Sequence, residues 1–504
     1  MAQYSHLGQP GPSISPLRPR PSTTRRGDWI KALHEQDNTL LAELVESQPP
    51  GEALFELETH INGLYRAYDI HARLMRGGNF GPAQTVEQSL ERLRQETKAK
   101  AERVVPFVES IRRSLGWDVR EFDLQLLKLI RRSSALSLVL GAGVSCAEPC
   151  GAPPWPALVK ELLQVTLDRG LEIPVRVSEE TEEIPLHASG APGDSSLQPE
   201  ASGATAMDPS INPDVRAETS RTTIVRFQQR RVREYTDAER QQAQEIIREI
   251  DAWEADDEVL KDGAELVHSL CGQHLFTYMT KILYRNHRQP SAIHRAIARL
   301  AHAQYVRDLP SPGCYPGWDA LITYNFDAFM SSALTDEGVP SAAWAMRGRE
   351  LAGDPNNFAL QQGQRCRWIQ DVLHLHGYTP PRCFQITNVR FVFATSQYTA
   401  TYDQEESAIF RKVMNEYLEN PIHVALYVGC SFADNNMNRL LERAIQRSPG
   451  RYHYALLKWP RNRRGVAPTA EELRTAEERY LAMGVRPIWF DEFAEILHLI
   501  ARLE

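Results

Sequence analysis

The stretch ALSLVLGAGVS, residues 135–145, decides the fold. Its first half is an apolar run, as expected of a strand buried on both faces of a parallel sheet. Its second half is a glycine-rich turn, in which Gly141 and Gly143 leave room for the backbone to turn sharply and approach a phosphate. We therefore predict a buried strand that enters a nucleotide-binding loop. A tight strand-to-helix turn without a ligand is the alternative.

Further apolar segments alternate with helical ones in the C-terminal part of the chain. Strands are expected at 320–327, 371–378, 423–432, 451–459 and 484–490. Such alternation is typical of a parallel sheet that helices cover on both faces. The predicted fold class is therefore α/β, a Rossmann-like parallel sheet, with an N-terminal helical region and an inserted helical segment.

Residues 29–117 are expected to form the helical region. Apolar side chains recur there at steps of three and four, which places them on one helical face. They are Leu54, Leu57, Ile61, Leu64 and Tyr68. Such a stripe packs either against the body of the protein or against another copy of the chain, and the sequence leaves both open.

The other segments differ in composition. Residues 1–28 are rich in Pro, Ser and Arg and are expected to form a disordered arm. Residues 118–504 are expected to form the main domain. Within it, residues 176–223 are acidic and rich in Ser, Pro and Gly, and residues 224–310 are strongly charged and helical in pattern. We expect a disordered insertion followed by a helical insertion.

Composition excludes several classes of protein. The chain has 57 Lys and Arg against 65 Asp and Glu, a net charge of −8, which disfavours a general binder of nucleic acid or anionic membranes. Its seven Cys include no CxxC pair, which argues against a disulfide framework and a zinc ribbon. No apolar run is long enough to span a membrane. These features favour a cytoplasmic protein with reduced thiols.

Polar side chains follow the predicted strand at 320–327. Thr323, Asn325 and Asp327 alternate, so on an extended strand they share a face. Ligands of open α/β sheets bind at the carboxyl ends of the strands, which makes these residues candidates for a site. A turn capped by the Asp side chain is the alternative.

Two further motifs also end strands. In HLHG, His374 and His376 share a face, and either a metal or a general base needs such a histidine. The metal needs more ligands than the sequence offers nearby, so no metal is expected. In VGCSFADNN, Gly429, Ser431 and Asp434 form a second candidate site for phosphate or ribose, although Asp434 is equally suited to cap a helix.

The order GAGVS, TYNFD, LHG, VGCSF resembles the sirtuin-like (silent information regulator type) NAD-consuming family over about residues 120–500. By that resemblance, Asn325 and His376 are the catalytic pair and Asp327 supports them. NAD is the substrate, and the resemblance gives eight residues in contact with it. They are Gly141, Ala142, Gly143, Ser145, Thr323, Gly429, Ser431 and Asp434.

Two departures from the protein deacylases of that family point to a subclass. The chain lacks the four-Cys zinc ribbon, and GAPPWPAL (151–158) stands where those enzymes carry Gly-Ile-Pro-Asp-Phe-Arg. Both departures resemble the bacterial anti-phage NADases, which cleave NAD to nicotinamide and ADP-ribose. The resemblance implies a regulated homo-oligomer with an unidentified trigger or partner protein. An ADP-ribosyltransferase or deacylase on the same fold, and a catalytically silent nucleotide-sensing scaffold, remain alternatives.

Overall fold

The computed structural model describes most of the chain. The described residues are 50–78, 82–115, 119–132, 135–169, 172–184, 220–231, 235–252, 256–271, 275–308, 318–345, 370–379, 392–397, 417–418, 420, 423–460 and 469–504. The predicted disordered arm, residues 1–28, lies outside this set, as does most of the predicted disordered insertion.

Seven parallel strands form the central sheet, in the order β5-β6-β4-β1-β7-β8-β9. Their bounds are β1 Leu136–Leu140, β4 Leu321–Thr323, β5 Ser341–Ala345, β6 Gln370–His374, β7 Val424–Val428, β8 His453–Lys458 and β9 Val485–Phe490. β1 is central, with β4 and β7 on its two sides. The chain therefore winds outward from β1 in both directions, which leaves a crevice at its carboxyl end. The predicted parallel α/β sheet is confirmed; the short edge strand β5 was not predicted.

Helices cover both faces of this sheet, and the buried side chains of β1 divide between them. Leu136, Leu138 and Leu140 pack against α5 (Val119–Arg132), α11 (Ala292–Asp308), α12 (Phe329–Asp336) and α18 (Glu495–Ala501). Val139 belongs to the opposite face, which α16 (Asn435–Arg447) and α17 (Ala470–Ala482) cover. This two-sided burial is the reason that residues 135–140 are apolar without alternation, with the exception of the buried Ser137.

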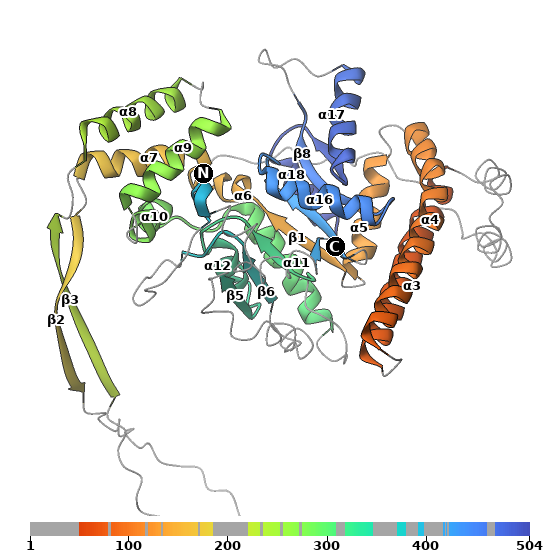
Figure 1. Ribbon diagram of the computed structural model, residues 1–504, viewed down its shortest axis with the longest axis horizontal. Helices are drawn as coiled ribbons and strands as arrows, with labels where there is room; N and C mark the ends of the chain where they lie inside the picture. The colour runs from red at the N-terminus through yellow and green to blue at the C-terminus, as the bar shows by residue number, and fades with distance from the viewer. Residues whose placement is uncertain are drawn as a thin grey trace, which may run out of the picture.

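Four helices form a second layer beside the sheet, with an apolar core of their own (Figure 1). They are α7 (Trp155–Arg169), α8 (Asp237–Asp251), α9 (Asp257–Cys271) and α10 (Leu275–Leu283). Phe326 and Phe393 belong to the same core, so it reaches the carboxyl ends of the strands. α11, by contrast, packs against the sheet although it lies within the predicted helical insertion.

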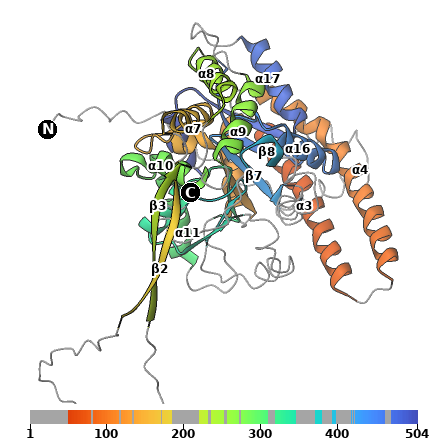
Figure 2. The same cartoon turned by 60° about the vertical axis from the view of Figure 1, so that its left-hand side comes forward.

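A two-stranded antiparallel ribbon projects from this helical layer (Figures 1 and 2). It consists of β2 (Glu172–Ile184) and β3 (Ser220–Arg231). These strands occupy residues 176–184 and 220–223 of the predicted disordered insertion and residues 224–231 of the predicted helical one. Glu172 stands opposite Arg231 in the register. Residues 185–219 lie outside the described residues.

The N-terminal helices form an antiparallel hairpin of α3 (Pro50–Gly77) and α4 (Ala83–Leu115). The predicted stripe on α3 packs mainly within this hairpin: Leu54, Leu57 and Ile61 are fully buried against α4. Pro106 lies inside α4 without ending it. The stripe's partner is therefore the second helix of the same chain.

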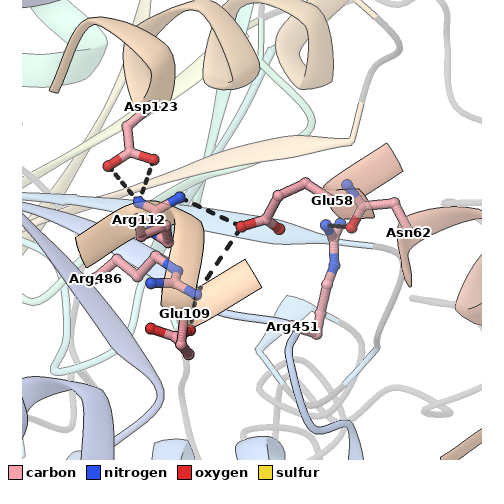
Figure 3. Close-up of polar contacts among 7 residues, drawn as sticks. All are labelled: Glu58, Asn62, Glu109, Arg112, Asp123, Arg451 and Arg486. Atoms are coloured by element: carbon pink, nitrogen blue, oxygen red, sulfur yellow. Dashed lines mark hydrogen bonds and ion pairs between the residues drawn. The ribbon is translucent and has the colours of Figure 1, made fainter. Parts of the chain in front are cut away.

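Buried ion pairs join the N-terminal hairpin to α5 and to strand β9 of the sheet (Figure 3). Arg112 of α4 binds Asp123 of α5 at 2.5 Å and Glu58 of α3 at 3.3 Å. Arg486 of β9 binds Glu109 of α4 at 2.5 Å and lies 3.9 Å from Glu58. Arg112, Asp123, Glu58 and Arg486 are all at most 8% exposed. Because a buried charge is costly unless it is paired, each of them depends on the others.

Candidate active site

The two glycine-rich loops lie against each other at the carboxyl end of β1. Gly143 N–H donates to the carbonyl oxygen of Gly429 at 3.0 Å. A Cβ added to Gly141 would lie 2.3 Å from that same oxygen. Gly429 adopts a φ of +70°, and a Cβ there would lie 2.6 Å from the backbone nitrogen of Val144. These glycines are therefore required by backbone packing between the loops, a reason that the sequence alone did not reveal.

A cavity of about 800 Å³ opens at this edge of the sheet. Its size lies in the range of sites for small molecules and cofactors. Its wall includes ten of the eleven predicted site residues, namely Gly141, Ala142, Gly143, Ser145, Asn325, Asp327, His376, Gly429, Ser431 and Asp434. Thr323 does not line the cavity. Its hydroxyl instead accepts from the backbone N–H of Asn325 at 3.0 Å, so Thr323 supports the loop that carries Asn325.

Asn325 is held by hydrogen bonds to the first glycine loop. Its side-chain Nδ2 donates to the carbonyl oxygen of Gly141 at 3.0 Å and to Ser145 Oγ at 2.9 Å. A primary amide has two N–H donors, and these contacts use both. The hydrogen-bonding capacity left for a ligand is therefore the amide oxygen, an acceptor.

Asp327, also part of the cavity wall, completes this network. Its Oδ2 accepts from Ser145 Oγ at 2.8 Å and its Oδ1 from the backbone N–H of Phe329 at 3.1 Å. Ser145 thus donates its hydroxyl to Asp327 while it accepts from Asn325, so the hydroxyl proton expected to serve a ligand is used internally. Burial raises the pKa of the Asp327 carboxyl to about 6.

The two histidines of HLHG have different surroundings. His376 lines the cavity, with its Nε2 4.0 Å from Asp434 Oδ2. His374 is fully buried outside the cavity wall, and its Nδ1 lies 3.1 Å from the backbone oxygen of Asn325. Burial lowers the pKa of His376 to about 3, so its imidazole is neutral near pH 7 and able to accept a proton.

Residues 319–488 match the family model described as the SIR2-like domain. That part of the chain is similar to a SIR2-like domain. The matched range includes Asn325, Asp327, His376 and the loop after β7, whereas β1 and the GAGVS loop precede it. SIR2-like domains use NAD. No curated protein matches the chain.

Aromatic side chains lie beside His376 and along the cavity wall. Tyr324 meets the imidazole edge-on at 4.8 Å between ring centroids, and Phe326 lies at 6.5 Å. Trp155 and Phe393 form an edge-to-face pair at 4.8 Å and line the cavity. None of these four residues was among the predicted site residues. Tyr324 and Phe326 stand within TYNFD, a signal that could have found them, whereas Phe393 lies outside the motifs, 17 residues after His376.

Asp434 combines the two roles that the sequence left open. Its Oδ1 accepts from the backbone N–H of Met437 at 3.3 Å and so caps α16. Its other oxygen is the one near His376. Because a carboxylate stabilises a nearby imidazolium, this arrangement favours proton transfer to His376.

The described part of the chain contains no group of three or more His, Cys, Asp or Glu side chains placed to hold a metal ion. No helix within it is both long enough and apolar enough to cross a membrane.

Proposed function

We propose that the protein is an NAD glycohydrolase that cleaves NAD to nicotinamide and ADP-ribose. The observation that carries the proposal is the meeting of three groups on one cavity wall. Asn325 and His376 both line the cavity, and Asp327 holds Asn325 through Ser145. The chemistry of this bond needs these parts and no metal.

The reaction breaks the bond between the ribose C1′ and the nicotinamide nitrogen. The bonding electron pair leaves with nicotinamide, which becomes neutral, and positive charge develops on the sugar. The amide oxygen of Asn325 accepts from the attacking water or a ribose hydroxyl and holds it in place. His376 accepts the proton that is released as the water oxygen bonds to C1′. Asp434, 4.0 Å from His376, favours the imidazolium so formed.

Incubation of the purified protein with NAD tests this proposal. Free nicotinamide and free ADP-ribose in equal amounts support a glycohydrolase. Nicotinamide with ADP-ribose attached to protein indicates an ADP-ribosyltransferase, and nicotinamide release only with an acylated peptide indicates a deacylase. Binding of NAD without nicotinamide release indicates a sensing scaffold. Each of these last three results contradicts the proposal.

The activity is expected to fall as the pH is lowered through about 6. The buried carboxyl of Asp327 has a pKa of about 6. Its protonation weakens the hydrogen bond that it accepts from Ser145, and Ser145 then holds the Asn325 side chain less firmly. His376 remains neutral over this range because its pKa lies near 3. A pH–rate profile between pH 4.5 and 8 checks this, and Asp327→Asn is expected to lose the acid limb along with part of the activity. An acid limb that survives unchanged in this variant contradicts the assignment.

The raised pKa of Asp327 has the opposite effect on the stability of the fold, which is expected to fall as the pH rises. A raised folded pKa means that Asp327 favours folding below its unfolded pKa and loses that contribution as the pH rises through about 6. For a shift of about two units, the loss amounts to roughly 3 kcal/mol. The Tm of the parent is therefore expected to fall relative to that of Asp327→Asn between pH 5 and pH 7.5.

We further propose that the protein acts in the cytoplasm in anti-phage defence, and that its activity is restrained until a trigger releases it. The reason is that unrestrained NAD cleavage would harm the cell that makes the protein.

The N-terminal hairpin has a surface suited to self-association. Ile70 and Leu74 of α3 are 52% and 64% exposed, one turn apart, beyond the part of the hairpin that packs on the sheet. We expect a homo-oligomer in light scattering of the full chain, and a monomer would refute this.

A further inference from the structure

The cavity extends past the groups assigned to the chemistry. Asn325 follows β4 and His376 follows β6, both on one side of the central strand β1. The cavity wall continues on the other side of β1, past β7 to the ends of β8 and β9, where Lys458 and Phe493 line it. If the scissile bond lies at Asn325 and His376, as proposed above, the adenosine half of the dinucleotide must extend toward Lys458 and Phe493.

Phe493 offers an aromatic face at that end. Its side chain is 54% exposed although it lines the cavity. Lys458, the last residue of β8, places its Nζ 4.8 Å from the centroid of the Phe493 ring. An exposed aromatic ring beside a cation suits a base that stacks and an anion bonded to the same nucleoside.

The charged side chains that line the cavity at this end are basic. Lys458 and Arg439 line this side of the cavity, and the carboxylates of the wall, Asp327 and Asp434, lie near the chemistry. Asp491 and Glu492, which precede Phe493 in the chain, lie outside the cavity wall. Dinucleotide sites that read a free ribose 2′-hydroxyl use an Asp or Glu, whereas those that accept a 2′-phosphate use a basic residue. Among the described residues, no carboxylate forms an ion pair with Lys458.

We propose that Lys458 binds the 2′-phosphate of a phosphorylated dinucleotide, with the adenine stacked on Phe493, so that the site accepts NADP as well as NAD. Lys458 is then the residue that determines this specificity. The inference rests on the proposed function, because that function sets the direction in which the dinucleotide lies. A lysine is suited to this task, since its ammonium binds a phosphate as a mobile point charge.

Calorimetric titration with ADP-ribose and with 2′-phospho-ADP-ribose tests the proposal without any turnover. The parent is expected to bind the 2′-phosphorylated ligand at least as tightly as ADP-ribose. Lys458→Ala is expected to weaken the phosphorylated ligand about tenfold more than ADP-ribose, the loss typical of one charge-assisted hydrogen bond. Lys458→Glu should weaken binding of the phosphorylated ligand still further relative to ADP-ribose. Phe493→Ala should weaken the binding of both ligands to the same extent.

Lys281→Ala is the matched control, because Lys281 also lies over an aromatic ring, that of Tyr278, but outside the cavity wall. It should leave the ratio of the two affinities unchanged. If the parent rejects the 2′-phosphorylated ligand, or if Lys458→Ala leaves the ratio unchanged, the role of Lys458 is refuted while the NAD site stands. If neither ligand binds the parent, the proposed function fails as well.

Discussion

Asn325→Ala and His376→Ala are each expected to lower NAD turnover by about 10²-fold or more, the usual contribution of a positioned general base. The first variant removes the amide oxygen proposed to hold the water, since both N–H donors of Asn325 bind Gly141 and Ser145. The second removes the neutral imidazole that takes the proton. Nicotinamide release under saturating NAD measures both effects, and the affinity for ADP-ribose should change much less.

Two other histidines provide controls for this experiment. His294 is also fully buried and, through burial, has a pKa lowered to about 3, but it binds Ser291 and lies outside the cavity wall. His294→Ala should therefore lower stability rather than the turnover of the folded enzyme. His374→Ala should cost less activity than His376→Ala, because His374 acts only through the backbone of Asn325. Full activity in a folded His376→Ala variant, or its loss in His374→Ala alone, would show that the wrong histidine was assigned.

Arg112→Met is expected to lower the free energy of unfolding by about 3–5 kcal/mol. The change leaves the carboxylates of Glu58 and Asp123 buried without the guanidinium that binds both. Urea denaturation of the full chain measures the loss. Arg502→Met is the matched control, because Arg502 pairs with Glu121 at the surface, where both side chains are more than 40% exposed. That variant should lose less than about 1 kcal/mol.

The partners of Arg112 allow a second check on the same prediction. In a background that already carries Glu58→Gln and Asp123→Asn, the carboxylates are gone, so Arg112→Met should cost much less than it does in the parent. If Arg112→Met costs the same in both backgrounds, the loss comes from packing of the side chain rather than from unpaired charge. If it costs under 1 kcal/mol in the parent, the network does not stabilise the fold.

The central strand and the helical stripe were predictable because each hydrophobic pattern depends only on which faces of that strand or helix are buried. Residues 135–140 are apolar apart from Ser137 because both faces of β1 are covered, and Leu54, Leu57 and Ile61 are spaced for one buried helical face. The partners were not predictable in the same way. That the stripe meets α4 rather than another copy depends on contacts between segments that the period does not specify.

The candidate site was likewise predictable only in part. That Asn325, Asp327 and His376 lie at one edge of the sheet follows from their positions at strand ends. The direction of each hydrogen bond does not, because it depends on atoms from other segments. Thus Ser145 donates to Asp327 rather than to a ligand, and Thr323 supports Asn325 from outside the cavity wall. Phe393, which lies outside the motifs, could not be assigned to the site from spacing alone.

The buried ion network also limits how this protein can diverge. Glu58 and Glu109 come from the N-terminal hairpin, Asp123 from α5 and Arg486 from β9, more than 300 residues away along the chain. Loss of Arg112 or Arg486 leaves buried carboxylates without the guanidinium that binds them. Each arginine is therefore expected to be retained together with its carboxylates or replaced together with them by apolar side chains. A hairpin transplanted from a distant relative would need the matching residue of β9 to come with it.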